Sequence, residues 1–191
     1  MRQTTNHFQV IGGTHRGRKF NFPDAPGLRP TPNKVRETLF NWIQFETNNR
    51  VFLDLFTGSG ALSFEAISRG ARQVIGIEKD LSAFQSLEKN RKNLKSDKIH
   101  FINTDALNFI SQKSTQMLDF ILLDPPFHQK LLEKALKSLS SNGFLTSGCK
   151  IYCESEFEIT EQLLSEKISQ KIKINKQKHS GQVHYCLIEV L

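Results

Sequence analysis

Short apolar runs alternate with longer amphipathic stretches from residue 51 onward. The stretches have the length and polarity of helices and cover residues 61–69, 81–94, 106–112 and 131–139. The apolar runs predict buried strands at 51–55, 73–78, 99–102, 120–123 and 151–154, with a closing hairpin at 171–174 and 183–190. Strands that alternate with helices form parallel sheets covered on both faces, so the pattern predicts an α/β protein with a doubly wound sheet.

The first part of the chain departs from this alternation. Residues 8–11 and 18–22 predict a small β-hairpin around a Gly-rich basic loop. After the hairpin, Thr31 can cap a helix that has Pro32 at its first position and ends near residues 48–49. The apolar stripe of this helix consists of Val35, Leu39, Trp42 and Ile43.

Composition limits the possible classes of protein. The 191 residues are 38% hydrophobic and 24% charged, which fits one domain, residues 1–191, with an extension (1–32) ahead of the core (33–191). No apolar run approaches the ~20 residues that span a bilayer. Residues 1–6 lack the apolar segment of a signal peptide. We therefore expect a cytoplasmic protein that does not associate with membranes.

The cysteines favour a reducing compartment. Cys149, Cys153 and Cys186 are odd in number and form no Cys-x-x-Cys pair, so we interpret them as small buried hydrophobes. Zinc bound by Cys149, Cys153 and a distant histidine is the alternative. We expect no metal.

The positive charge is concentrated rather than spread. Of a net charge of +7, residues 1–36 contribute seven cations against the single acid Asp24: Arg2, Arg16, Arg18, Lys19, Arg29, Lys34 and Arg36. A second, acid-free group consists of Lys167, Lys171, Lys173, Lys176 and Lys178. Such clusters are typical of proteins that bind polyanions, although edge-strand protection would also explain the second group. Arginine outnumbers lysine in the first group, which favours nucleic acid.

A glycine loop after the first core strand predicts a nucleotide-type ligand. Asp54 ends the strand, and Gly58 and Gly60 precede a helix, as in Rossmann folds. Ser63 replaces the third glycine of the dinucleotide pattern, and Asp54 would repel a pyrophosphate but attract a cationic sulfonium and amine.

Two further acids, at the ends of the next two predicted strands, belong to the same expected pocket. Glu78 can accept the ribose hydroxyls, and Asp105 the adenine amine, with Ala106 supplying backbone. Each acid alone could be a simple helix cap, but three at successive strand ends favour S-adenosylmethionine. The expected cofactor residues are Asp54, Phe56, Thr57, Gly58, Ser59, Gly60, Glu78, Lys79, Asp105 and Ala106.

The catalytic candidates end the most apolar strand. Asp124, Pro125, Pro126 and Phe127 follow the run 120–123, where the carboxyl ends of parallel strands place ligands. The carboxylate and the proline carbonyls are acceptors beside an aromatic face, a combination suited to a planar amine. The alternative is a strand-ending turn with a capping aspartate.

The chain resembles a known family in these motifs. The segments 54–62, 78–80, 105–107 and 124–127 are similar to those of class I methyltransferases of amino groups. The N-terminal segments Arg16-Gly17-Arg18, 27–31 and 35–42, with the C-terminal 151–154 and Gly181-Gln182-Val183-x-Tyr185, resemble bacterial small-subunit ribosomal RNA (guanine-N2)-methyltransferases.

The resemblance implies a fold, a reaction and a partner. The fold is a Rossmann-like, seven-stranded sheet with one antiparallel strand from the hairpin around Gly181. The reaction is methyl transfer to N2 of one guanine in 16S rRNA, with Asp124 and the Pro125 carbonyl accepting from the amine and Phe127 stacking on the extruded base. The partner is 16S rRNA. We expect a monomer that acts on a small-subunit particle, with free RNA as the alternative substrate. The expected RNA contacts are Arg16, Arg18, Arg29, Lys34 and Arg36.

Other functions compete with this one. Adenine N6 or a protein glutamine amide would suit the same Asp-Pro-Pro-aromatic motif, although the basic extension favours RNA. An NAD-dependent oxidoreductase is disfavoured by Ser63, and a non-catalytic RNA-binding protein by the complete set of pocket residues.

Overall fold

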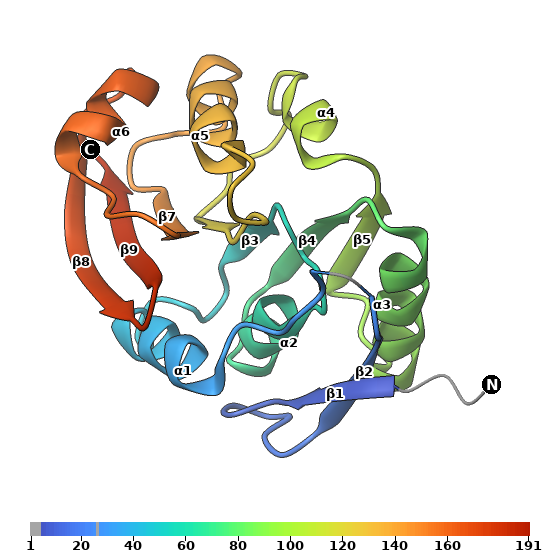
Figure 1. The fold of residues 1–191 in the computed structure, drawn as a ribbon. Coiled ribbons are helices and arrows are strands. Elements are labelled where there is room, and N and C mark those ends of the chain that lie inside the picture. Colours follow the sequence, from blue (N-terminus) through green and yellow to red (C-terminus); the bar gives the residue numbers. More distant parts are fainter. Residues whose placement is uncertain (1–4, 26) are drawn as a thin grey trace.

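The computed structural model describes residues 5–25 and 27–191, and its centre is one seven-stranded sheet in the order β5-β4-β3-β6-β7-β9-β8 (Figure 1). Its strands are β3 (Val51–Asp54), β4 (Gln73–Glu78), β5 (Ile99–Asn103), β6 (Phe120–Leu123), β7 (Lys150–Ser155), β8 (Ile172–Ser180) and β9 (Val183–Val190). The helices are α1 (Asn33–Trp42), α2 (Ala61–Ser68), α3 (Leu81–Leu94), α4 (Ala106–Ile110), α5 (Leu131–Ser141) and α6 (Glu161–Lys167).

The direction of the strands confirms the predicted sheet. β5, β4, β3, β6 and β7 are parallel, whereas β9 is antiparallel to both of its neighbours, β7 and β8. The chain runs outward from β3 to β5 and then returns to place β6 on the other side of β3. A ligand crevice in such sheets lies outside the carboxyl ends of the two strands at this reversal, here β3 and β6.

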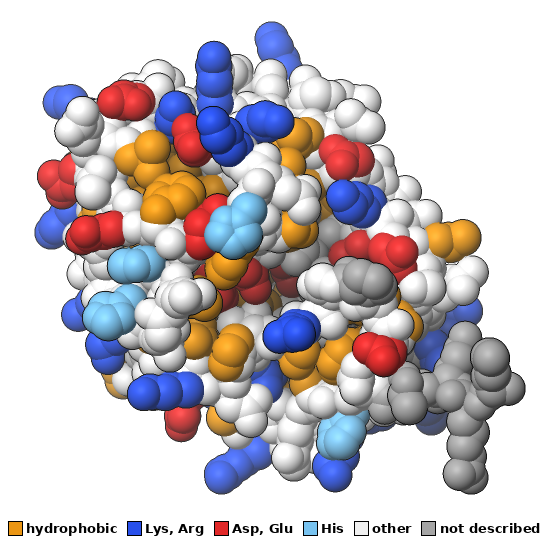
Figure 2. Space-filling view, in the orientation of Figure 1, with side chains coloured by type: hydrophobic (Ala, Val, Ile, Leu, Met, Phe, Trp, Pro, Cys, Tyr) orange, Lys and Arg blue, Asp and Glu red, His pale blue; other side chains and the backbone are white. Residues whose placement is uncertain are grey.

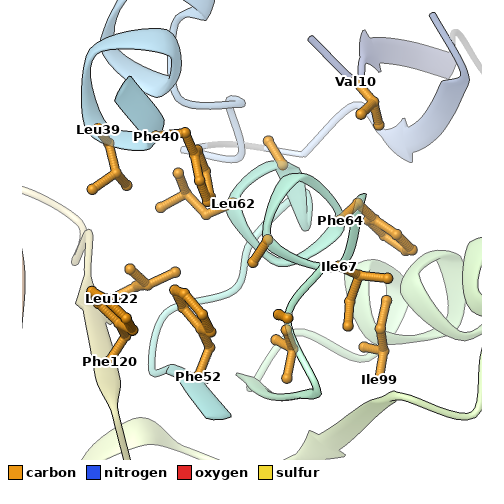
Figure 3. Packing of buried hydrophobic residues seen from close by; sticks show 14 of the residues in the cluster. Val10, Leu39, Phe40, Phe52, Leu62, Phe64, Ile67, Ile99, Phe120 and Leu122 are labelled. Carbon is orange, nitrogen blue, oxygen red and sulfur yellow. The ribbon is translucent and has the colours of Figure 1, made fainter. Parts of the chain in front are cut away.

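Two apolar layers hold the helices on the sheet. Helices α1, α2 and α3 cover one face, and α4, α5 and α6 cover the other. On the first face the rings of Phe52 and Phe120, from neighbouring strands, stack with centroids 4.6 Å apart beneath Leu39, Phe40 and Leu62 (Figure 3). This packing joins β3 and β6 near their amino ends.

The N-terminal extension is a hairpin packed on the first face. Strands β1 (Thr5–Gln9) and β2 (Lys19–Pro23) pair antiparallel, which confirms the predicted hairpin, although β1 begins three residues before the predicted strand at 8–11. Phe20 stacks on Phe64 of α2 with a centroid separation of 4.2 Å. The Asn21 carbonyl of β2 accepts hydrogen bonds from Ser86 and Asn90 of α3. Arg2 of the basic group lies outside the described residues.

Two helices differ from the prediction. α1 ends at Trp42, before the predicted end near residues 48–49, because the chain continues as a turn in which the Glu46 and Thr47 amides bond to the Ile43 carbonyl. The sequence pattern gave no helix where α6 lies, which the Thr160 hydroxyl caps at 3.2 Å from the Leu163 amide. In the described part of the chain, no helix combines the length and apolarity needed to cross a bilayer.

Candidate active site

Three carboxyl groups meet at the carboxyl ends of adjacent strands. Asp54 ends β3, Asp124 follows β6, and Glu154 lies near the end of β7. Leu123 pairs with Cys153, so Asp124 and Glu154 occupy neighbouring positions one residue further along, on the face that carries α1 and α2. Figure 2 shows acidic side chains on the floor of a hollow in this side of the molecule.

Asp54 is buried without a full set of hydrogen bonds. Its carboxyl is 1% exposed and accepts from the Ser63 hydroxyl at 2.6 Å through Oδ2, while Oδ1 has no partner within the described residues. Burial, opposed by the Ser63 hydrogen bond, raises the pKa of Asp54 to about 7. A buried, unsatisfied oxygen requires a donor. A cationic amine would supply both a proton and a charge, so these residues fit S-adenosylmethionine.

The glycine loop and Glu78 form one hydrogen-bonded unit. Gly58 and Gly60 have φ angles of 54° and 85°, and a Cβ on Gly60 would lie 2.5 Å from Leu87 Cδ2, so glycine is required there. The Glu78 carboxylate accepts from the Gly58 amide and the Asp80 amide, both at 2.8 Å. A carboxylate has about four acceptor positions. Glu78 is thus oriented by the loop and keeps capacity for hydroxyl donors.

The remaining cofactor candidates have simpler structural roles. Asp105 Oδ1 accepts from the Leu107 and Asn108 amides at 2.9 and 3.2 Å, so Asp105 is the N-cap of α4. Its contact with adenine stays a prediction. The others lie along the same edge: Thr57, Ser59, Gly60 and Ala106 are buried, Phe56 and Gly58 are half-buried, and Lys79 is exposed.

Asp124 is held by a residue that the sequence analysis had assigned to another role. The Thr31 hydroxyl donates to Asp124 Oδ2 at 3.1 Å, and it makes no capping bond to α1, whose N-cap is Pro32. The predicted Thr31 cap was therefore wrong. Burial, partly offset by the Thr31 hydrogen bond, raises the pKa of Asp124 to about 6. At neutral pH the carboxyl is therefore mainly ionised and can accept from an amine.

The segment after Asp124 is held by a hydrogen bond to Glu156, the residue that follows β7. Pro125 is buried, Pro126 is exposed and Phe127 is half-buried. The next residue, His128, has a φ of 62°, and its amide donates to Glu156 Oε1 at 2.7 Å. This bond holds the segment that carries the Phe127 ring.

Sequence reasoning did not assign the third carboxyl group, Glu154, to this site. Glu154 is 2% exposed and accepts from the Tyr152 hydroxyl at 2.9 Å. Burial, with a further contribution from Asp124, raises the pKa of Glu154 well above its usual range. The available clue was a glutamate at the end of a strand that is otherwise apolar.

The predicted RNA residues do not form one cluster. Arg29 and Lys34 are exposed on either side of Thr31 and hence close to Asp124. Arg16 is exposed in a loop that is hydrogen-bonded to Ser68, at the end of α2 farther from the glycine loop. Arg18 is exposed, donates to the Asn93 carbonyl and lies 5.7 Å from the Phe20 ring.

Arg36 was predicted to contact RNA, and this prediction was wrong. Its side chain is 0% exposed, donates to the Gln9 carbonyl at 2.9 Å and to Asn33 Oδ1, and lies 3.7 Å from Glu65. Glu65 also accepts from the Ile11 and Gly12 amides. Arg36 and Glu65 therefore join the N-terminal extension to α1 and α2.

The described residues hold no group of three His, Cys, Asp or Glu side chains arranged for a metal ion. Cys149, Cys153 and Cys186 are free thiols buried in the core.

Known proteins share this fold over nearly its whole length. The Escherichia coli protein yhhF superposes with a TM-score of 0.85 at 39% identity and covers 97% of this chain and 98% of its own. A T. thermophilus 16S rRNA N2 G1207 methyltransferase, solved with AdoMet and guanosine, has a TM-score of 0.72 at 20% identity over 98% of this chain and 50% of that chain. The fold is the Rossmann-like fold of methyltransferases.

Sequence comparison assigns the family. Curated proteins called "Ribosomal RNA small subunit methyltransferase D" are 40% identical over 97% of this chain and 91% of the relative in Escherichia coli K12, and 42% identical over 78% of each in Haemophilus influenzae. The family model described as "Conserved hypothetical protein 95" matches residues 8–189. The chain belongs to this family, which confirms the resemblance found in the motifs.

Proposed function

We propose that the protein transfers a methyl group from S-adenosylmethionine to the exocyclic N2 amine of a guanine in the RNA of the small ribosomal subunit. The observation that carries the proposal is the ionisable Asp124 carboxyl at the β3–β6 crevice, beside the buried Asp54. The names of the curated relatives support the same substrate class.

On this proposal the chain's own residues bind the cofactor through complementary charge. When bound, S-adenosylmethionine supplies an electrophilic methyl group on a sulfonium. Asp54 Oδ1 accepts from the amine of the methionine portion, and Glu78 accepts from the ribose hydroxyls. Asp105 keeps Oδ2 for the adenine amine while Oδ1 caps α4.

Asp124 and the Pro125 carbonyl accept from the two hydrogens of the target amine. The lone pair of this nitrogen is delocalised into the guanine ring, so hydrogen bonds that favour a pyramidal nitrogen make it a better nucleophile. A nitrogen–carbon bond would form as the carbon–sulfur bond breaks and its electron pair stays on sulfur as a neutral thioether, and the nitrogen would then lose one proton to water. Orientation is the largest contribution, because the reactants are held in a near-attack geometry.

Phe127 stacks on the base once it has left its helix. Arg29 and Lys34, exposed on either side of Thr31, bind phosphates near the mouth of the pocket. The substrate is the RNA within a small-subunit particle, and the enzyme acts on it as a monomer. Because this substrate is found in the cytoplasm, we expect the enzyme there as well.

A labelled-methyl assay tests this function. Purified protein and S-adenosylmethionine are incubated separately with unmodified 16S rRNA, with small-subunit particles and with ribosomal protein. The proposal predicts label in RNA, lost in Asp124→Asn and retained in the surface control Asp97→Asn. Label in the protein fraction alone would favour a glutamine amide as the acceptor, and label in neither fraction would refute methyl transfer to ribosomal components.

A further inference from the structure

The edge strand β8 and the residue before it carry four exposed lysines. They lie in an acid-free stretch, residues 167–188, and are Lys171, Lys173, Lys176 and Lys178, which we call the lysine row. Figure 2 shows Lys and Arg side chains, with acidic side chains among them, along the left border of the molecule, where Figure 1 places β8. By contrast, Lys167 of the same stretch is paired with Glu133 at 3.0 Å.

The pairing of β8 with β9 places the row on a single face. Lys173 lies opposite Glu189, Lys176 opposite Leu187 and Lys178 opposite Tyr185. These partners are alternate residues of β9, and alternate residues of a strand share a face. The Lys171 carbonyl accepts from the Leu191 amide at 2.8 Å. Leu191 is two residues beyond Glu189, so Lys171 falls on the same face as the other three lysines.

A β-bulge makes this arrangement possible. Numbering alone would place Lys171 and Lys173 on the face opposite to Lys176 and Lys178. The register shift between Ile174 and Lys176 inserts Asn175 as an extra residue, whose side-chain Nδ2 donates to Glu189 Oε2 at 2.7 Å.

The face that carries the row is the one that carries α1. Tyr185 lies on this face under Trp42 of α1, with ring centroids 5.6 Å apart. Ile172 and Ile174 of β8 pack instead against the core on the opposite face. α1 therefore covers the middle of this face and leaves the lysines exposed.

Edge-strand protection does not explain the single face. Lysines on either face of an edge strand would hinder pairing with another chain, and a bulge hinders it as well. Within residues 5–25 and 27–191, no carboxylate forms an ion pair with a member of the row. Successive members lie two register positions apart, roughly 7 Å, a spacing comparable to that of successive phosphates on an RNA strand.

We propose that the lysine row binds the phosphates of the RNA strand that flanks the target nucleotide. This inference rests on the proposed function. β8 runs parallel to β6, so Lys178 lies at the edge of the sheet where Asp124 lies, and Lys171 lies at the far edge. The row therefore leads RNA away from the pocket along the side of α1.

Neutralisation of the row gives the first test. In the full-length Lys173→Gln/Lys176→Gln/Lys178→Gln variant, the negative slope of log K against log salt for unmodified 16S rRNA should become shallower by about 2–3 units. The affinity for S-adenosylmethionine should not change. A matched control removes three exposed lysines on and beside α4 and α5: Lys113→Gln/Lys134→Gln/Lys137→Gln. The proposal predicts a wild-type slope for this control, and equal losses in both variants would overturn it.

A second variant keeps the charge and moves it to the other face. Exchange of Lys176 with Gln177 and of Lys178 with His179 (Lys176→Gln/Gln177→Lys/Lys178→His/His179→Lys) leaves the composition and the edge lysines unchanged. The proposal predicts that the negative slope becomes shallower by about 1–2 units, because two phosphate contacts are lost. Wild-type RNA affinity would overturn the proposal in favour of edge protection.

The failure of this inference can be distinguished from failure of the proposed function. A wild-type protein that transfers no methyl group to RNA refutes the function. An active wild type with superimposable slopes in both row variants refutes the row alone. Wild-type binding to free RNA with reduced methylation of small-subunit particles would assign the row to a protein surface and overturn the RNA assignment.

Discussion

Replacement of Asp54 by Asn should stabilise the ligand-free protein above neutral pH while removing its affinity for S-adenosylmethionine. The side chain is 1% exposed, and one of its oxygens has no hydrogen-bond partner within the described residues. Ionisation of this carboxyl is therefore unfavourable unless a cationic group, such as the amine of S-adenosylmethionine, binds beside it. Asn keeps the shape, and its amide oxygen can still accept from the Ser63 hydroxyl.

The size of the effect follows from the pKa of Asp54, which rises from an ordinary 3.8 to about 7 on folding. Between these values the folded state binds more protons than the unfolded state, so the free energy of unfolding falls as pH rises. A shift of about three units corresponds to roughly 4 kcal/mol at pH 8. Well below pH 3.8 the carboxyl is neutral in both states and the cost disappears, and at pH 4 only a small part of it remains.

Urea unfolding at pH 4 and pH 8, with and without S-adenosylmethionine, measures this effect. Without the cofactor, Asp54→Asn should be more stable than wild type at pH 8 and nearly equal at pH 4. The cofactor should stabilise the wild type alone. The surface variant Asp97→Asn controls for the loss of one acid. An Asp54→Asn protein that is less stable than wild type at pH 8, or that is stabilised equally by the cofactor, would refute the argument.

Three further predictions concern the other acids. Glu78→Ala should weaken S-adenosylmethionine binding by roughly 1–3 kcal/mol in calorimetry, and an unchanged affinity in a folded variant would remove Glu78 from the site. Asp124→Asn should lose turnover with cofactor affinity within about tenfold, and wild-type kcat/KM for RNA, measured with S-adenosylmethionine saturating, should rise up to about pH 6 and then level off, because the carboxylate form is required; a flat profile through pH 6 contradicts this role. Glu65→Ala should lower the free energy of unfolding by about 3–5 kcal/mol in urea, since it leaves Arg36 buried without its carboxylate, and a loss below about 1 kcal/mol would contradict this.

The central elements could be predicted because their determinants are local. The observed β4 and α3 have the predicted bounds, residues 73–78 and 81–94. An apolar run fixes the first, and the Asp80 cap, which accepts from the Ala83 amide at 2.8 Å, fixes the start of the second. Asp54, Glu78 and Asp124 were found by the same logic, because their position follows from the end of each apolar run. Glu154 was missed, because it lies inside β7 as the next-to-last residue of the strand.

Tertiary contacts account for the failures. Thr31 has the composition of a helix cap, but its hydroxyl bonds to Asp124, 93 positions away. Arg36 is a cation in a basic segment, and only the folded chain shows that Glu65 and the Gln9 carbonyl enclose it. No pattern within residues 171–178 predicts the bulge at Asn175, because a bulge is defined by the partner strand. The lysines could be counted in sequence, but their common face could not.

Nucleoside analysis of the methylated RNA tests the central claim most directly. Unmodified 16S rRNA, free and in small-subunit particles, is incubated with the protein and labelled S-adenosylmethionine, digested to nucleosides and resolved by mass spectrometry. The account predicts that the label is recovered as N2-methylguanosine and that Asp124→Asn produces none. Label recovered as N6-methyladenosine, or in N2-methylguanosine at an equal rate with Asp124→Asn, would contradict it.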